Sequence, residues 1–240
     1  MKKPFIKSAE EIRNIKKACK VTDLAFDYIL KRIILWKSKK ELARELTIFL
    51  KKRSDGIAFR TIVSFGENSS EIHHKPGNRR LQYGDMIMFD FGAKIKGFCS
   101  DMTRTVFFGK TSNKQKRLYK TVLTSQKKAI EYLEKSISKR RWVKGARVDK
   151  VARKYIESKG YPTIPHSLGH GIGRKVHMGP RIAPKSRTRL KPGMVFTIEP
   201  AIYLKGFGGV RIEDVVLLRK TGVEVLTKSP KSITETQKLS

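Results

Sequence analysis

The chain has 240 residues, of which 39% are hydrophobic and 9% aromatic, enough for the core of one sizeable domain, so a wholly disordered protein is excluded. Its two cysteines, Cys19 and Cys99, have no CxxC spacing, which excludes a disulfide framework and a zinc knuckle. No apolar run approaches the ~20 residues that cross a bilayer, and the basic N-terminus lacks the apolar stretch of a signal peptide. We therefore expect a soluble, cytoplasmic protein without a membrane partner.

Basic residues dominate the charge. Lysine and arginine together number 54 against 21 acidic residues, a net charge of +33, and residues 111–160 hold 16 basic and 4 acidic residues. Such a surface attracts polyanions through counterion release, which predicts weak association with RNA or ribosomes. A solvated helix face explains the same lysines, because no aromatic stacking platform or nucleic-acid motif accompanies them. Composition leaves both interpretations open.

The first half of the chain reads as helices followed by a strand hairpin. Ser8 and Glu11 form a capping box that opens a helix, and helical periodicity returns over residues 24–35 and 40–52. Strand-like segments occupy residues 60–65, 86–91 and 98–108. The last two are joined through GAKIKG, whose glycines suit a tight hairpin, so we expect Asp90 and Asp101 on paired strands near the turn, close enough to share a metal.

The second half repeats this order of helices and then strands. Helices are predicted over 112–137 and 148–156, strands over 194–200 and 210–218, and a glycine-rich turn at GHGIG (169–173). Residues 229–240 are polar and are expected to form a frayed tail. No low-complexity linker divides the chain, so we expect a single α+β domain over residues 1–228, built from two related halves.

Four carboxylates and one histidine stand out within apolar strands or the glycine-rich turn: Asp90, Asp101, His170, Glu199 and Glu213. One such acid can be a strand-end residue that faces water, but four buried acids need cations or protons to offset the cost of burial. A pair of divalent ions meets that need, because carboxylates can bridge two ions about 3.5–4 Å apart. The oxygen-rich set favours Mn²⁺, Fe²⁺ or Co²⁺ over a thiolate-bound structural zinc.

The remaining histidines gather near the same segments. All five lie in residues 71–77 and 165–180, and this clustering favours metal binding and proton transfer over scattered structural roles. Period-two alternation places Arg211 on the strand face of Glu213, and Thr197 on that of Glu199. We therefore expect a cation and a hydroxyl close to the carboxylates.

The segments DFGAKIKGFCSDMTRTV, SLGHGIGRKVH and IEPAIYLKGFGGVRIED carry a resemblance. From about residue 8 to 228 the chain resembles the pita-bread metallopeptidases, the superfamily of methionine aminopeptidase, aminopeptidase P, prolidase and creatinase. The resemblance implies an α+β pita-bread fold with two pseudo-related halves around a dimetal site. It implies that Asp101 and Glu213 bridge the ions, that Asp90 chelates one, and that His170 and Glu199 bind the other. Mn²⁺ is the expected metal, with Co²⁺, Fe²⁺ and Zn²⁺ as alternatives.

Within that superfamily, a histidine four residues before the ligand histidine and the arginine of GGVRIED are similar to aminopeptidase P and prolidase. The resemblance implies substrate-binding roles for a set of five side chains: His73, His166, His177, Tyr203 and Arg211. It implies catalytic roles for His73, His177 and Glu199, where His73 is preferred over His74 because it precedes Pro76 by three residues. Relatives commonly have an acid at position 178, where this chain has Met178.

The implied activity is that of a hydrolase, a metallo-aminopeptidase or dipeptidase that removes the N-terminal residue from Xaa-Pro peptides through a metal-bridged hydroxide. One alternative is a methionine aminopeptidase that acts on nascent chains, which the compact length and positive charge favour. Another is a non-catalytic RNA- or ribosome-binding module on the same fold. The intact ligand set argues against the module, because buried carboxylates without metal are costly to keep.

Overall fold

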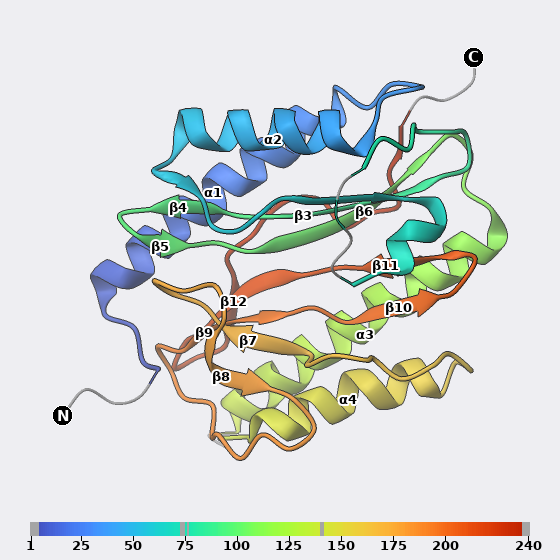
Figure 1. Ribbon diagram of the computed structural model, residues 1–240. Coiled ribbons are helices and arrows are strands. Elements are labelled where there is room, and N and C mark those ends of the chain that lie inside the picture. The colour runs from blue at the N-terminus through green and yellow to red at the C-terminus, as the bar shows by residue number, and fades with distance from the viewer. Residues whose placement is uncertain (1–4, 73–74, 76, 140–141, 237–240) are drawn as a thin grey trace.

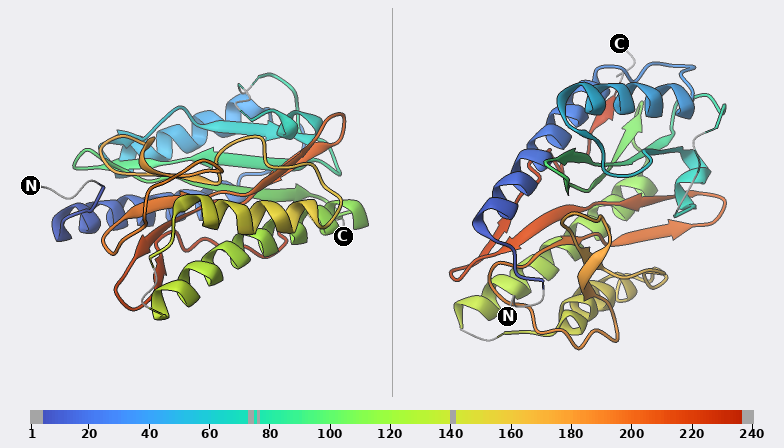
Figure 2. Two further views of the ribbon diagram at one scale, coloured as in Figure 1. Left: turned by 90° about the horizontal axis from the view of Figure 1, so that it is seen from below. Right: turned by 60° about the vertical axis from the view of Figure 1, so that its left-hand side comes forward.

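The computed structural model describes residues 5–72, 75, 77–139 and 142–236. Two larger β-sheets are each backed by a pair of helices (Figure 1). Helices α1 (Ala9–Leu30) and α2 (Lys39–Arg53) cover one sheet, and α3 (Asn113–Ser138) and α4 (Gly145–Glu157) cover the other. The two helix pairs lie on opposite sides of the molecule in the further views (Figure 2).

Serine side chains begin three of these helices. Ser8, Ser38 and Ser112 each accept a hydrogen bond from the backbone of the third helical residue in a capping box, as predicted for Ser8. Helix α1 runs without interruption to Leu30, whereas the sequence predicts a break before residue 24. The polar Thr22 does not end the helix, because its hydroxyl bonds the Ala18 carbonyl at 3.1 Å and lies 2.6 Å from the Ser100 hydroxyl.

The first sheet has the strand order β14-β6-β3-β2. Its members are β2 (Ile62–Phe65), β3 (Met86–Phe91), β6 (Met102–Phe108) and β14 (Glu235–Thr236). The predicted strand over 98–108 is divided into β5 (Phe98–Cys99) and β6, because the chain leaves the ladder at Ser100 and Asp101. The predicted pairing of 86–91 with 98–108 is present between β3 and β6. GAKIKG is predicted only as a turn, but it contains β4 (Ala93–Ile95), which pairs with β5 and with β1 (Gly56–Ile57).

The second sheet has the order β13-β12-β9-β7-β8. Its members are β7 (Gly169–Gly171), β8 (Met178–Ile182), β9 (Val195–Ile198), β12 (Asp214–Leu218) and β13 (Val223–Val225). GHGIG thus begins as strand β7 and is not the predicted turn. The predicted strand over 210–218 also divides: β11 (Gly208–Arg211) pairs with β10 (Ala201–Leu204), and β12 pairs with β9. Ile212 and Glu213 lie in the break between them.

The core is split between the two layers. One buried cluster joins α3 and α4 to the second sheet through residues such as Leu118, Val148 and Phe196. Another joins α1 and α2 to the first sheet through residues such as Phe26, Leu46 and Phe89. A third cluster joins α1 and β5 to the second sheet through residues such as Ile15, Cys99 and Val215.

The expected polar tail instead belongs to the fold over its described part. Glu235 and Thr236 form β14, which pairs in parallel with Phe107 and Phe108 of β6. Upstream, the backbone N–H groups of Lys228 and Ser229 donate to the Asp23 carboxylate. Local composition does not reveal this, because both partner segments are more than a hundred residues away. No described helix is long and apolar enough to cross a membrane.

Candidate metal centre and substrate cavity

Two of the predicted ligands come from the first sheet. Asp90 lies in β3, where it faces Thr103 across the antiparallel ladder. Asp101 directly precedes β6 and is buried. The predicted proximity of the two aspartates thus follows from the β3–β6 pairing.

The other three ligands come from the second sheet and its edge. His170 lies in β7, Glu199 directly follows β9, and Glu213 lies in the break between β11 and β12. The N–H of Glu213 donates to the carbonyl of Thr103 at 3.1 Å, which joins this break to the first sheet. The acids of the two halves therefore meet where the sheets come together.

Ligand atoms of Asp101, His170 and Glu213 all lie within 4.8 Å of one another. His170 Nε2 is 3.6 Å from Asp101 Oδ2 and 3.3 Å from Glu199 Oε1. The four residues thus present one imidazole nitrogen and three carboxylates to a common space, a donor set that suits hard or borderline divalent cations.

Electrostatics in this space are those of a cation site. Burial and the neighbouring carboxylates raise the pKa of Asp101 and of Glu199 well above their ordinary values. Burial and Asp90 raise the pKa of Glu213 to about 8. Burial and His177 lower the pKa of His170 to about 4, so its imidazole is neutral near pH 7 and free to bind a metal. Protons or cations must offset the acids, and the set fits a pair of divalent ions.

Two threonines orient the glutamates. Thr103 Oγ1 donates to Glu213 Oε2 at 2.7 Å, and Thr197 Oγ1 donates to Glu199 Oε1 at 3.0 Å. Thr197 also accepts from the N–H of His170 at 3.1 Å, so one hydroxyl holds two proposed ligands. A hydrogen bond to one oxygen of a metal-binding carboxylate fixes the direction in which its other oxygen points.

Arg211 connects the centre to the cavity wall. Its guanidinium donates to Asp90 Oδ2 at 2.5 Å, to Thr103 Oγ1 at 3.0 Å and to the Tyr203 hydroxyl at 2.7 Å. The Tyr203 hydroxyl lies 3.2 Å from His166 Nε2, so three of the five predicted substrate-binding residues form one hydrogen-bonded chain. Thr103 bonds both Arg211 and Glu213, which links the two residues. They do not lie on one continuous strand, because β11 ends at Arg211.

A cavity of about 770 Å³ opens onto this cluster. His166, His170, Glu199 and Arg211 line its polar part, together with His177, whose ring centroid lies 4.3 Å from that of His170. Its walls also include apolar or backbone groups of Phe5, Ile72, Met178 and Gly179. Predicted residue His73 lies outside the described residues.

Residues 13–220 match metallopeptidase family M24. The chain belongs to this family. It is 38% identical over 231 residues to the Xaa-Pro dipeptidase of Pyrococcus horikoshii, which covers 95% of this chain and 64% of that protein. Two solved structures superpose with a TM-score of 0.91: the Xaa-Pro dipeptidase from Bacillus anthracis, at 39% identity, and an X-Pro aminopeptidase from Thermotoga maritima, at 38%. Each comparison covers 96% of this chain and 64% of the other.

These likenesses confirm the predicted pita-bread superfamily and its α+β fold. The chain spans 64% of the length of these M24 relatives, so their full activities are not carried over by the match alone. Metallopeptidase membership implies resident metal ions, and the cluster of Asp101, His170 and Glu213 supplies suitable ligand atoms for them.

Thr103 and Phe5 belong to this M24 site but are not predicted from the sequence. Thr103 bonds Glu213, and Phe5 lines the cavity. Thr103 lies two residues after Asp101, so strand alternation gives a signal for it. Phe5 carries no such signal, because its place depends on packing against Gly179, where an added Cβ would lie 2.2 Å from the Phe5 ring.

Proposed function

We propose that the chain is a dimetal peptidase that cleaves the bond between an N-terminal residue and proline. The main support is that ligand atoms of Asp101, His170 and Glu213 lie within 4.8 Å of one another beside a cavity. The chain is also 38% identical to an Xaa-Pro dipeptidase. The proposed ligands of the two ions are Asp90, Asp101, His170, Glu199 and Glu213. Mn²⁺ is the proposed metal, because the set has four carboxylates and one imidazole.

Two bound ions would polarise the scissile carbonyl and lower the pKa of a water molecule. We assign the proton transfer to Glu199, which lines the cavity and whose Oε1 is held by Thr197. In that role Glu199 would take a proton from this water and return it to the leaving nitrogen. His177 and His73 are proposed to hydrogen-bond the substrate as charge develops on its oxygen.

Proline lacks an amide N–H, so the site must recognise it by shape and by the groups on either side. We assign that task to His166 and Tyr203, whose polar atoms are 3.2 Å apart, with Arg211 holding the Tyr203 hydroxyl. Burial raises the pKa of Tyr203, which keeps its hydroxyl protonated and able to donate near neutral pH. A methionine-removing site has no evident use for this polar group.

The decisive experiment compares Xaa-Pro dipeptides and tripeptides with Met-Ala-Ser, using metal-free protein to which Mn²⁺ is added back. We expect turnover of the proline peptides only. If the protein cleaves Met-Ala-Ser and does not cleave Xaa-Pro peptides, the Xaa-Pro proposal is wrong and methionine aminopeptidase takes its place. A protein that binds two Mn²⁺ ions and cleaves neither would contradict both.

A second proposal concerns the basic surface, which we suggest binds polyanions such as ribosomal RNA weakly. Helix α4 supports it with a depression of about 400 Å³ lined by Arg147, Lys150 and Lys154, together with Glu157 and the ion pair of Arg153 with Asp149. Retention on RNA or heparin should fall steeply with salt, whereas turnover of small peptides should change little.

Residues 1–228 with the packed segment after them are proposed to act as one catalytic domain in the cytoplasm.

A further inference from the structure

A buried amide on helix α3 contacts both segments that carry the glutamates. Gln126 is fully buried, and its Nε2 donates to the carbonyl of Ile198 at 3.1 Å and to the carbonyl of Ile212 at 3.2 Å. Ile198 directly precedes Glu199, and Ile212 directly precedes Glu213. A single side chain thus ties together the two backbone positions from which the proposed glutamate ligands project.

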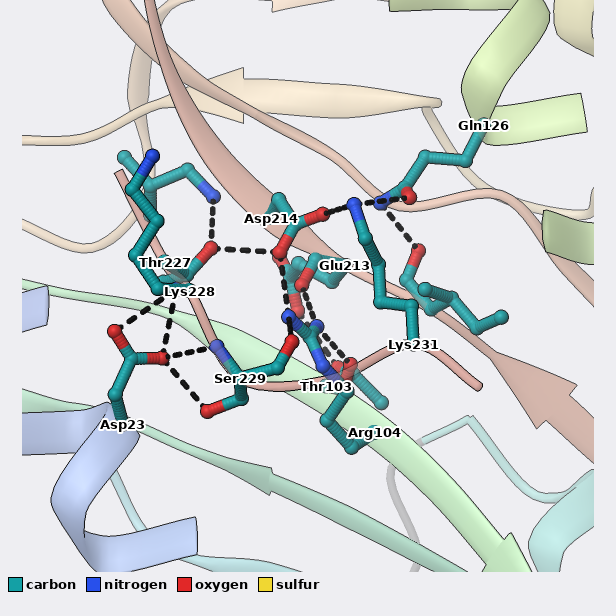
Figure 3. Close-up of polar contacts among 12 residues, drawn as sticks. Asp23, Thr103, Arg104, Gln126, Glu213, Asp214, Thr227, Lys228, Ser229 and Lys231 are labelled. Carbon is teal, nitrogen blue, oxygen red and sulfur yellow. Dashed lines mark hydrogen bonds and ion pairs between the residues drawn. The ribbon is translucent and has the colours of Figure 1, made fainter. Parts of the chain in front are cut away.

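Lys231 fixes the orientation of that amide. Its ammonium donates to Gln126 Oε1 at 3.2 Å and also contacts Asp214 Oδ2, as Figure 3 shows. Because an ammonium only donates, it selects the oxygen of the amide and turns Nε2 toward the two carbonyls. Lys231 therefore links the packed segment after residue 228 to the amide that bonds the two glutamate-bearing segments.

Arg104 holds the other side of the Glu213 peptide. It is 1% exposed, and it donates to the carbonyl of Glu213 at 2.5 Å and to Asp214 Oδ1 at 2.6 Å (Figure 3). Glu213 lies in the break between β11 and β12, outside the paired strands. Gln126 of α3 and Arg104 of β6 thus bond the carbonyls of Ile212 and Glu213 at this break, where no strand ladder pairs them.

We propose that Gln126 and Lys231 are positioning residues that set the separation of the Glu199 and Glu213 carboxylates, and thereby the affinity for the ion these two residues share. The proposal rests on the metal site proposed above. Without the amide, the two segments are joined less directly, and the carboxylates are free to move apart. Residues that orient metal ligands from outside the ligand set commonly change metal affinity by about 10–100-fold when replaced.

The test uses the full chain with Gln126→Met, which keeps the size of the side chain and removes both donors. Lys231→Met removes the orienting cation, and Lys231→Arg restores a cation that can reach the same partners. Lys228→Met is the matched control, because Lys228 is exposed and offers only its backbone N–H to Asp23. Metal-free protein is titrated with Mn²⁺ by calorimetry, and its melting temperature is measured separately.

We expect wild type and Lys228→Met to bind two Mn²⁺ ions alike. Gln126→Met and Lys231→Met should each bind one of the two ions at least about tenfold more weakly, with most of the loss recovered in Lys231→Arg. With an Xaa-Pro peptide at fixed Mn²⁺, kcat should fall while KM changes less. If Gln126→Met does not fold, Lys231→Met carries the test.

A lower melting temperature with wild-type Mn²⁺ affinities would overturn the proposal, because the network would then only anchor the C-terminal segment. A different result separates the proposed function from this inference. If wild type binds two Mn²⁺ ions with the expected dependence on Gln126 but cleaves no Xaa-Pro peptide, the positioning role stands and the assigned activity falls.

Discussion

Arg211 Nη2 lies 2.5 Å from Asp90 Oδ2, so the arginine of GGVRIED is paired with a proposed metal ligand. Its other donors go to Thr103 and Tyr203, and only 3% of the residue is exposed. The guanidinium is therefore less available to a substrate than the substrate-binding role implied by the resemblance requires. Its contacts are with the proposed ligand Asp90 and with Thr103 and Tyr203.

Replacement of Arg211 by alanine should consequently weaken metal binding as well as Xaa-Pro turnover. The change removes the hydrogen bond that orients the Asp90 carboxylate, and we expect about 10–100-fold weaker binding of the ion at Asp90. Mn²⁺ titration of metal-free protein measures this directly. Arg219→Ala is the control, because Arg219 pairs with Glu224 at the surface. Undiminished Mn²⁺ affinity in Arg211→Ala would return the arginine to a purely substrate-binding role.

The stability of the metal-free protein should fall as the pH rises. An unfolded glutamate has a pKa near 4.3, whereas burial and Asp90 raise the pKa of Glu213 to about 8 in the fold. A raised folded value means that the contribution is fully present below about pH 4 and is lost as the pH rises through about 8. Melting temperatures measured from pH 5 to 9 should decline without Mn²⁺ and decline less with it. A flat metal-free profile would contradict the raised value.

Mn²⁺ binding should release protons at pH 7. Burial and Asp90 raise the pKa of Glu213 to about 8, so it holds a proton at pH 7 that a divalent ion displaces. Burial also raises the pKa of Asp101 and of Glu199. Calorimetric titrations in buffers of different ionisation enthalpy give the number released. Glu213→Gln should lower that number, and equal heats in all buffers would show that Glu213 is already ionised.

Gly169 is required by the close approach of β7 to β9. A Cβ at this position would lie 1.9 Å from the carbonyl oxygen of Thr197. Gly169→Ala should therefore destabilise the fold by about 1–3 kcal/mol, as overpacking does, and displace His170. Denaturant unfolding and Mn²⁺ titration measure the two effects. Gly222→Ala is the matched control, because an added Cβ there meets nothing within 4 Å.

His177→Ala should reduce Xaa-Pro turnover by about 10²-fold or more while both metals remain bound. The His177 ring lies beside that of His170 and lines the cavity, where it can bond the substrate. Steady-state kinetics and metal analysis of the same preparation measure the two quantities. If Mn²⁺ is lost in this variant, His177 belongs to the ligand set and the assignment must be redrawn.

The sequence predicts those parts of the site that depend on local pattern. Asp90 and Asp101 could be placed on paired strands, and Thr197 beside Glu199, because alternation along a strand needs only neighbouring residues. The break after Arg211 escaped prediction, since nothing in VRIEDVV distinguishes one strand from two. Gln126 escaped as well, because its partners are 72 and 86 residues away along the chain.

The segment after residue 228 closes long loops of the chain. Glu235 and Thr236 of β14 pair with β6, more than a hundred residues earlier, and Lys231 bonds Gln126 and Asp214. Contacts between residues so far apart in sequence cost more loop-closure entropy than the local contacts of a helix, and they form more slowly. We therefore expect the proposed metal centre to gain these supporting contacts late in folding, after the helices have formed.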